Sequence, residues 1–358
     1  MKRIQLSLST RVILMTIILL GFGLIMIYSA SVAEGARDFS NKWHFVFLQL
    51  KWAGFGLLAM LGLSLFPPRF LEKLAPFFLI GGLFLLLLVV IPGVGILVQG
   101  ARRWLVLPGL TLQPSELIKF IEVIYLSTWL TSGKRTLVQF GVLVSLLAGL
   151  IMLEPDMGTT LVVTLLAVAL YFLSGYPLKH LLALGLFGLI VGAGLILTEP
   201  YRLARVKTYL DPMNDPQGSS YHMRQVILSL GSGGISGLGI GRSRQKYAYL
   251  PEATTDSIFA VVGEELGFIG GVLLILAFIY YLSLIFKIAA HTHDKFESTL
   301  VSGVGAWIAL QVCLNLAAMV ALIPLTGVPL PLVSYGGSAL VTMLAGIGLV
   351  LSVAHHQK

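Results

Sequence analysis

The sequence predicts an all-α polytopic membrane protein with about ten transmembrane helices, and three observations lead to this prediction. The 358 residues are 57% hydrophobic and only 11% charged, whereas a soluble globular chain carries about 25% charged residues. Apolar stretches long enough to cross the roughly 30 Å of bilayer hydrocarbon recur along nearly the whole chain. One long polar interruption, at about 199–256, divides them. We therefore expect residues 1–358 to form a single transmembrane domain.

The predicted helices are separated by residues that end helices. Proline lacks a backbone donor and glycine frees the backbone, so Pro67-Pro68 and Pro92-Gly93 mark helix ends. The first apolar run follows Lys2 and Arg3, and we interpret it as an uncleaved helix because it is long enough to span the membrane. The predicted helices cover residues 11–30, 45–66, 74–92, 114–130, 137–153, 158–174, 180–198, 257–286, 298–323 and 336–354.

Basic residues predict which side of the membrane each connection occupies. An even number of spans places both termini on one side. Lys and Arg gather at the termini and in the short connections of that same side, whereas the opposite short connections hold few of them. Short cytoplasmic loops carry an excess of Lys and Arg. We therefore expect cytoplasmic termini and a long outer loop at about 199–256, and we expect that loop to be non-helical.

The segment near 324–337 is a second irregular region. It contains three prolines and three glycines between Ile323 and Ser338, so it cannot form a regular helix. Irregular backbone at membrane depth is tolerated only where protein buries it or where it lines a wet cavity. We therefore expect a re-entrant segment that packs into the helix bundle beside the functional site.

Several classes of function are excluded. Cys313 is the single cysteine, so neither a disulfide nor a cysteine-built metal site forms within the chain. The glycine-rich run Gly231–Gly241 lacks the closing Gly-Lys-Ser/Thr of a phosphate-binding loop. No basic run is long enough to indicate nucleic-acid binding. The histidines, His222 among them, lack zinc-site spacing and are interpreted as surface or interface residues.

Three charged residues near the predicted 114–130 helix are candidates for substrate binding. Glu116 and Lys119 are spaced i, i+3 and share a helix face. An ionisable pair within a membrane span is either a structural ion pair or part of a functional site, and the spacing leaves both open. Arg103 precedes Trp104 and is either an interfacial anchor or a ligand for an anionic head group.

Asp256 is the sharpest candidate for chemistry. It lies where the polar stretch becomes an apolar helix, so it is either an N-terminal cap or a general base. Cations nearby on the same loop suit a substrate that carries phosphates. Glu264 and Glu265 follow on different faces of the next helix, and one of them is expected to cap, pair or hold a cation, which the sequence leaves open. The loop residues expected to bind substrate are Arg242, Gln245, Lys246 and Glu252, with Arg244 beside them.

Several short motifs follow one another in order along nearly the whole chain. They are Tyr28-Ser-Ala-Ser31, Gly100-Ala-Arg-Arg-Trp104, Gln113-Pro-Ser-Glu-Leu-Ile-Lys119, Glu154-Pro-Asp-Met-Gly-Thr159, Arg202-Leu-Ala-Arg-Val through Leu210-Asp-Pro, Gly231-Ser-Gly-Gly, Leu250-Pro-Glu through Asp256, Gly263-Glu-Glu-Leu-Gly267 and Pro329-Leu-Pro-Leu-Val-Ser-Tyr-Gly-Gly-Ser338. Together they resemble the motifs of the SEDS family (shape, elongation, division, sporulation) of peptidoglycan glycosyltransferases. The stretch Gly239–Lys246 is similar to the division and sporulation type and less so to the rod-shape type.

The resemblance implies a function. It implies polymerisation of lipid II into glycan strands at the outer face of the bacterial cytoplasmic membrane, during division or wall growth. The family's catalytic aspartate matches Asp256, and its cavity-lining residues match Arg103, Glu116 and Lys119. A class B penicillin-binding protein is the implied partner, with other divisome or elongasome proteins. No cofactor is certain, and Mg²⁺ or Mn²⁺ near the pyrophosphate remains open.

The chain departs from the family pattern next to Asp256. The usual sequence His-Thr-Asp-Phe is here Thr254-Thr-Asp256-Ser257, and His222 stands where Gln is usual. Two other functions stay open. A flippase or transporter of the same lipid would also need intramembrane charges. A non-catalytic scaffold that recruits its transpeptidase would tolerate the altered flanks of Asp256.

Overall fold

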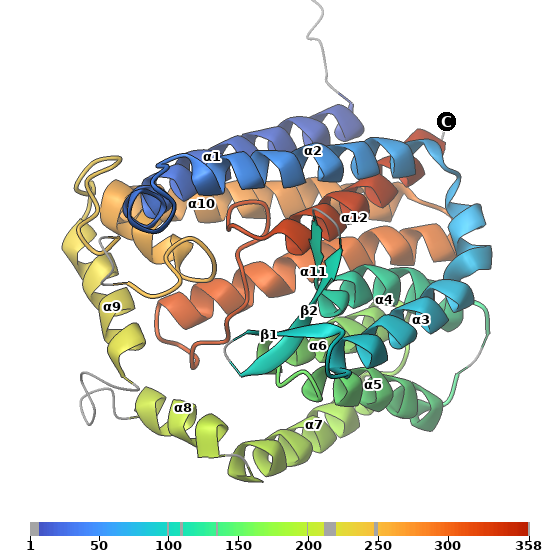
Figure 1. Cartoon of the computed structure of the whole chain (residues 1–358). Coiled ribbons are helices and arrows are strands. Elements are labelled where there is room, and N and C mark those ends of the chain that lie inside the picture. Colours follow the sequence, from blue (N-terminus) through green and yellow to red (C-terminus); the bar gives the residue numbers. More distant parts are fainter. Residues whose placement is uncertain are drawn as a thin grey trace, which may run out of the picture.

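The computed structural model describes residues 7–98, 100–107, 110–133, 135–198, 200–210, 220–246 and 250–356. Most of these residues are helical, and the longest helices pack together as a bundle (Figure 1). The elements in chain order are α1 (Leu8–Phe39), α2 (His44–Leu65), α3 (Pro68–Val90), β1 (Gly95–Val98), β2 (Ala101–Leu107), β3 (Leu110–Leu112), α4 (Pro114–Thr131), α5 (Leu137–Met152), α6 (Met157–Leu173), α7 (Leu178–Thr198), α8 (Pro200–Leu210), α9 (Tyr221–Gly233), α10 (Ile258–His291), α11 (Lys295–Met319) and α12 (Gly337–His356).

Each predicted apolar stretch overlaps one helix, and the polytopic all-α class is confirmed. Within the described residues, α1, α2, α3, α7, α10, α11 and α12 are each long and apolar enough to cross a membrane. The apolar helices α5 and α6 are shorter. The α4 helix has 18 residues and carries Glu116, Lys119 and Glu122. The number of helices that cross the bilayer therefore stays a prediction.

The polar stretch at 199–256 was expected to be non-helical, and this is wrong. It contains α8 and α9. Pro200 occupies the first position of α8, where its missing N–H costs nothing, and no further Pro or Gly follows within the helix. The α9 helix buries Met223, Val226 and Ser229, whose spacing places them on one face. Tertiary contact with that face stabilises a helix that polarity alone did not predict.

A small antiparallel sheet joins α3 to α4, where only a connection was expected. Its strand order is β1-β2-β3, and Val98 pairs with Ala101 across a tight turn that includes Gly100, whose φ is +81°. A Cβ atom on Gly95 would lie 1.9 Å from the Val89 carbonyl oxygen at the end of α3. The sheet therefore packs directly on that helix end and fixes the position of β2.

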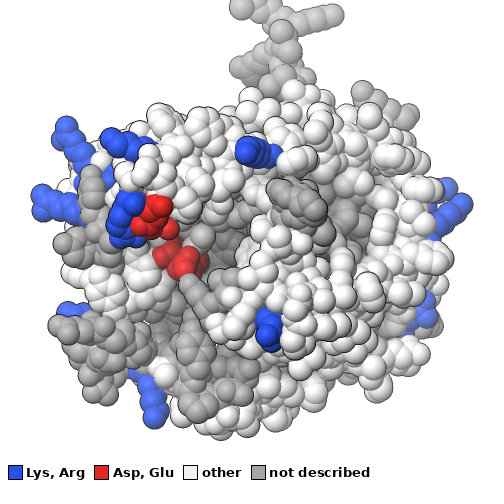
Figure 2. All heavy atoms as spheres, in the orientation of Figure 1, with Lys and Arg blue, Asp and Glu red and all other residues white. Residues whose placement is uncertain are grey.

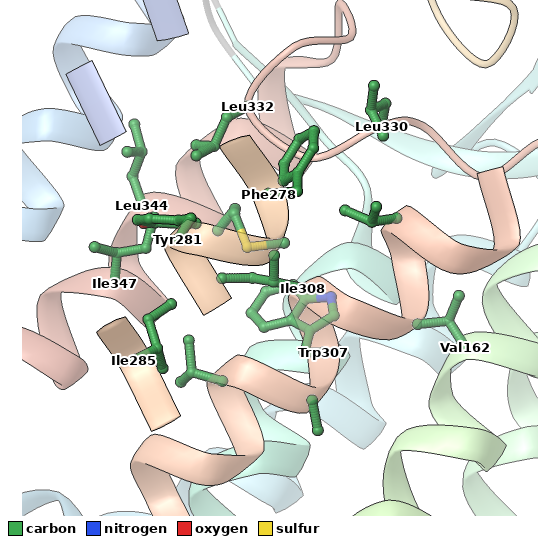
Figure 3. Packing of buried hydrophobic residues seen from close by; sticks show 14 of the residues in the cluster. Val162, Phe278, Tyr281, Ile285, Trp307, Ile308, Leu330, Leu332, Leu344 and Ile347 are labelled. Carbon is green, nitrogen blue, oxygen red and sulfur yellow. The ribbon is translucent and has the colours of Figure 1, made fainter. Parts of the chain in front are cut away.

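The hydrophobic core lies where α10, α11 and α12 meet, around the fully buried side chain of Trp307 (Figure 3). Phe278 and Tyr281 of α10 approach it, and Leu344 of α12 closes the cluster. The Tyr281 hydroxyl lies 2.8 Å from the hydroxyl of Thr16, which joins α10 to α1. This packing holds the helices that position the site.

The Pro/Gly segment is irregular and buried, as expected. No regular helix forms between α11 and α12, both of which lie within the described range 250–356, and Leu330, Leu332 and Val333 are nearly inaccessible to solvent. A Cβ atom on Gly23 of α1 would lie 2.6 Å from the Leu332 carbonyl oxygen. The segment is therefore enclosed by protein, and Figure 3 shows it looping over the core.

The surface agrees with a membrane protein. Large apolar side chains are exposed along most helices, and no residue described in α7 is buried. On the face shown in Figure 2, most Lys and Arg side chains lie at the two lateral margins, and the broad area between them is largely uncharged. The Asp and Glu side chains on this face gather at one place near the margin where Figure 1 shows α9.

Candidate functional site

Asp256 lies in the turn before α10, and its side chain is almost buried, with 9% relative exposure. The Thr255 hydroxyl lies 3.4 Å from Asp256 Oδ1 and donates to Glu252 Oε2 at 2.8 Å. Ser257 occupies the capping position of α10. Asp256 therefore lies one residue before the cap of α10.

The Pro/Gly segment holds this turn from one side. The backbone N–H of Tyr335 donates to the Thr254 carbonyl at 2.8 Å, and the Ser334 hydroxyl donates to the Thr255 carbonyl at 2.5 Å. Asn315 of α11 donates to the carbonyl oxygens of Asp256 and Val328. A Cβ atom on Gly327 would lie 3.9 Å from Asp256 Oδ2. The Asp256 carboxylate therefore faces a glycine of the irregular segment.

The starts of α6 and α4 lie on the other side of that segment. A Cβ atom on Gly158 would lie 2.3 Å from the Thr326 carbonyl oxygen. Asp156 caps α6 by accepting from the backbone N–H of Thr159 at 3.0 Å, and Gln113 Nε2 lies 3.5 Å from the Asp156 carboxylate. Motifs distant in the sequence therefore meet at the end of the bundle that carries Asp256.

Arg103 ties the sheet to the α5–α6 connection. Its Nε donates to the Glu154 carbonyl at 2.9 Å, and its Nη2 donates to the Pro155 carbonyl. The side chain remains partly exposed. This geometry places the Arg103 guanidinium at the edge of the site. The position is compatible with both alternatives, an interfacial anchor and a ligand for an anion.

Glu154 is buried beside Arg103, and sequence reasoning missed it. Neither oxygen of its carboxylate has a hydrogen bond of ordinary geometry to a described residue. Burial, and then the nearby charge of Asp156, raises the pKa of Glu154 to about 8, and Ser115 and Arg103 only partly oppose this. A carboxylate before a proline between two apolar helices was the signal for it in the sequence.

Glu116 and Lys119 form the expected i, i+3 pair, with Lys119 Nζ 2.6 Å from Glu116 Oε1. Both side chains are buried, and Lys119 Nζ lies 5.8 Å from the ring centroid of Trp307. Glu122 follows Lys119 by three residues, is buried, and has no hydrogen bond from a described residue to either carboxylate oxygen. The α4 helix therefore turns a charged face into the bundle, and the i, i+3 spacing was the signal for Glu122.

Lys246 belongs to a second buried cluster. Its Nζ lies 3.3 Å from Glu265 Oε1, and it donates to the Gly241 carbonyl at 2.7 Å. Ser29 of α1 donates to the same Glu265 oxygen at 2.6 Å. Lys246 therefore helps to join the 241–246 loop, α10 and α1. The sequence predicted that Lys246 binds substrate, and the structure places it inside this buried cluster.

Helical spacing predicts different directions for Glu264 and Glu265, and the sequence left open whether one of them caps, pairs or holds a cation. Glu264 accepts from the backbone N–H of Arg244 at 2.8 Å, and Glu265 accepts from the backbone N–H of Gly241 at 3.0 Å. Ser243 donates to both carboxylates. The loop curves around the helix and covers both side chains, so both accept hydrogen bonds from it, and Glu265 is also paired with Lys246.

The other predicted loop residues occupy different depths. Arg242 and Arg244 are exposed, and Gln245 is half-buried. Its Oε1 atom is buried and has no hydrogen bond to any described residue. Glu252 is exposed in the left-handed region, with φ of +50°, and contacts Thr255 beside Asp256. The structure thus brings Glu252 to Asp256 and places the two arginines at the surface.

Comparisons with known proteins agree with this architecture. The family model described as cell cycle protein, covering FtsW, RodA and SpoVE, matches residues 10–358. Stage V sporulation protein E of Bacillus subtilis (strain 168) is 38% identical over 357 residues, covering 97% of this chain and 96% of that protein. The probable peptidoglycan glycosyltransferase FtsW of Nitrosococcus halophilus (strain Nc4) is 40% identical over 344 residues, covering 94% and 89%.

Two solved structures share the fold. A chain of a peptidoglycan synthase complex, solved to describe how polymerization and crosslinking are coordinated, superposes with a TM-score of 0.79 at 30% identity and covers 97% of each chain. The rod shape determining protein RodA of Thermus thermophilus superposes with a TM-score of 0.71 at 30% identity, covering 96% of this chain and 95% of that one. Matched along nearly its whole length in sequence and in fold, the chain belongs to the SEDS family of FtsW, RodA and SpoVE.

Proposed function

We propose that this protein is a peptidoglycan glycosyltransferase that polymerises lipid II at the outer face of the bacterial cytoplasmic membrane. One observation carries the proposal: Asp256 is a nearly buried carboxylate at the end of the bundle where the family motifs meet. The relatives named as probable peptidoglycan glycosyltransferases span almost the same length. The loop residues that resemble the division type favour a role in cell division over rod-shape elongation.

Asp256 acts as the general base in this proposal. The 4-hydroxyl oxygen of the acceptor sugar attacks the anomeric carbon of the donor, and Asp256 takes the hydroxyl proton. The bond from that carbon to the pyrophosphate oxygen breaks, and undecaprenyl pyrophosphate leaves with the electron pair. The α linkage becomes β, so the reaction inverts the centre. A positioned base contributes typically about 10²–10⁴-fold to such a step.

Cationic side chains stabilise the leaving pyrophosphate. Arg103, Arg242 and Arg244 are partly or fully exposed and are accessible to its phosphates. Lys119 and Lys246 are already paired with Glu116 and Glu265, so in this proposal they act on the substrate from within those ion pairs. Gln245 Oε1 is a further acceptor for the substrate's hydroxyl or amide groups.

A divalent cation fits the residues at one position. Within the described ranges, no three or more His, Cys, Asp or Glu side chains cluster to hold a metal ion. Mg²⁺, however, is usually held by one or two carboxylates plus substrate phosphates. Asp256 and Glu252, both in contact with Thr255, would supply those carboxylates. When bound, Mg²⁺ or Mn²⁺ would neutralise charge on the pyrophosphate.

The proposed partner is a class B penicillin-binding protein that crosslinks the new strand, alongside other divisome or elongasome proteins. The solved relative from a peptidoglycan synthase complex supports this assignment. The termini are proposed to lie in the cytoplasm, which places Asp256 outside, where lipid-linked sugars meet. Both lipid tails then remain in the bilayer during the reaction.

A lipid II flippase is the second candidate, and the buried charged face of α4 favours it. Glu116, Lys119 and Glu122 lie inside the bundle, and intramembrane ionisable residues are typical of substrate and ion pathways. A non-catalytic scaffold for the transpeptidase is a third candidate. The experiment below separates all three.

The test is polymerisation of labelled lipid II by the purified full-length protein, with and without its cognate transpeptidase, comparing wild type with Asp256→Asn. We expect polymer from wild type and none from the folded variant, because the amide cannot accept the proton. Asp294→Asn is the matched control, since Asp294 caps α11 near Arg69 at the opposite end of the bundle. It should cost about 1 kcal/mol of stability at most and leave polymerisation intact.

Two outcomes contradict the enzymatic proposal. Polymer from Asp256→Asn at the wild-type rate would remove Asp256 from the chemistry. No polymer from wild type with an active transpeptidase and added Mg²⁺ would favour the other candidates, and lipid II translocation in proteoliposomes then separates flippase from scaffold.

A further inference from the structure

The α9 helix is fixed against the first half of α10, and one of its contacts reaches the Asp256 turn. Near the end of α9, a Cβ atom on Gly233 would lie 2.0 Å from the Gly263 carbonyl oxygen, so the two backbones touch. Gly263 in turn leaves space for Leu230, whose Cδ2 would lie 2.4 Å from a Cβ atom there. The crossing permits little sliding, because any side chain larger than hydrogen at either glycine would clash.

At the start of α9, His222 contacts the turn that carries Asp256. His222 Nε2 lies 2.7 Å from the hydroxyl oxygen of Ser257, the residue that follows Asp256. The Ser257 side chain is fully buried. Its backbone N–H donates to the Glu252 carbonyl at 3.1 Å, and its carbonyl accepts from the backbone N–H of Ala260 at 3.0 Å. Ser257 therefore joins the turn to the first turn of α10.

We propose that His222 is a positioning residue that fixes the Asp256 turn through the Ser257 hydroxyl, an inference that rests on the proposed function. The Pro/Gly segment and Asn315 hold the turn from one side by hydrogen bonds to its carbonyl oxygens. The imidazole adds a contact from α9, a helix that the Gly233–Gly263 crossing keeps in place. Asp256 is thereby held between two supports.

A general base needs this support because its oxygen must remain within hydrogen-bond reach of the proton it removes. A displacement of about 1 Å at a catalytic group costs about 100-fold in rate. Residues 252–256 form no regular element, so their geometry depends on side-chain contacts from neighbouring helices. His222 supplies such a contact from α9.

The test compares His222→Ala, His222→Gln, Ser257→Ala and the double variant in the lipid II polymerisation assay with the cognate transpeptidase. We expect His222→Ala to lower kcat about 10- to 100-fold with no change in KM, and to lower Tm slightly because the buried Ser257 hydroxyl loses a partner. Gln should restore most of the activity, since its side-chain amide can either donate a hydrogen bond to a hydroxyl or accept one from it. If His222 acts through Ser257, the double variant should be no slower than the slower single variant.

His180→Ala is the matched control. His180 Nδ1 lies 2.8 Å from the Tyr171 hydroxyl, which is also a histidine–hydroxyl contact. Tyr171 lies near the C-terminal end of α6, whereas Asp156 caps the N-terminal end. Removing it should leave kcat unchanged. Wild-type kcat in His222→Ala, additive losses in the double variant, or no rescue by Gln would each overturn the positioning role.

Hydrogen exchange supplies a readout that does not depend on the reaction. His222→Ala should increase deuterium uptake in peptides covering 252–260, and His180→Ala should not. If wild type makes no polymer, the proposed function fails. Deuterium uptake still tests whether His222 holds the Asp256 turn through Ser257. Unchanged uptake at 252–260 in folded His222→Ala would overturn the proposal by itself.

Discussion

Glu154 is a buried carboxylate at the edge of the site, and neither of its oxygens has a hydrogen bond of ordinary geometry to a described residue. Its pKa of about 8 lies above the ordinary value of 4.5, mainly because burial disfavours the charged form. The folded protein therefore binds a proton at Glu154 that the unfolded chain has lost between about pH 4.5 and 8. Stability falls as pH rises through this window, because ionisation of Glu154 stabilises the unfolded chain while the folded protein keeps this side chain neutral.

We expect Glu154→Gln to remove this pH dependence. The variant should be more stable relative to wild type at pH 8.5 than at pH 5, because the amide remains neutral. The measurement is Tm in detergent at both pH values. Glu252→Gln is the control, since that side chain is exposed and its replacement should change Tm equally at both. An identical difference in Tm for Glu154→Gln at the two pH values would contradict the assignment.

At the scale of the elements, the irregular segment between α11 and α12 depends on small residues in the helices around it. Gly158 at the start of α6 and Gly23 of α1 each approach a carbonyl oxygen of that segment more closely than a methyl group permits. The segment in turn holds the Asp256 turn through hydrogen bonds from Tyr335 and Ser334 to its carbonyl oxygens. Helix packing and site geometry are therefore coupled through backbone contacts.

Gly158→Ala should displace the segment at Thr326 and lower polymerase activity. The added methyl would lie 2.3 Å from the Thr326 carbonyl oxygen, which is backbone and cannot rotate away. Overpacking of this kind costs about 1–3 kcal/mol, visible as a lower Tm. Gly192→Ala on α7 is the matched control, because no described atom lies within 4 Å of the position that its methyl group would occupy. Equal behaviour of the two variants would refute the coupling.

At the scale of the whole molecule, the connections between helices gather at two opposite ends of the bundle. Asp256, Gly158 and Ser338 belong to the end with the candidate site, whereas Arg69 lies 3.9 Å from Asp294 at the opposite end. Ser352 there donates to the Phe66 carbonyl. The largely uncharged area between the two margins of Figure 2 lies where the hydrocarbon of the bilayer is expected. Such an arrangement assigns one end to each side of the membrane.

Labelling of single cysteines tests that assignment. In a Cys313→Ser background, Arg37→Cys at the end of α1 should react with a membrane-impermeant maleimide in intact spheroplasts. Lys295→Cys at the start of α11 should react only after permeabilisation. Both positions are exposed, so accessibility depends on the side of the membrane. The reverse pattern would invert the proposed topology.

The sequence by itself determined the class of protein and the order of its main helices. Apolar length decides whether a segment spans a bilayer, because no lipid-exposed backbone group can stay without a hydrogen bond. The same local logic predicted the Glu116–Lys119 pair, which needs only i, i+3 spacing, and the irregular backbone near 324–337, which needs only Pro and Gly. Asp256 was found from its place between loop and helix and from the resemblance.

Only the tertiary structure decided what those residues contact. The α9 helix forms because its apolar face packs on α10, and Glu264 and Glu265 share one loop because that loop curves around them. The contact of His222 with Ser257 joins residues 35 positions apart. Such contacts depend on how separate helices pack in three dimensions, which no local spacing encodes. Local sequence patterns therefore predicted the helices, local context and the resemblance indicated the candidate base, and packing supplied the surroundings in which that base is proposed to work.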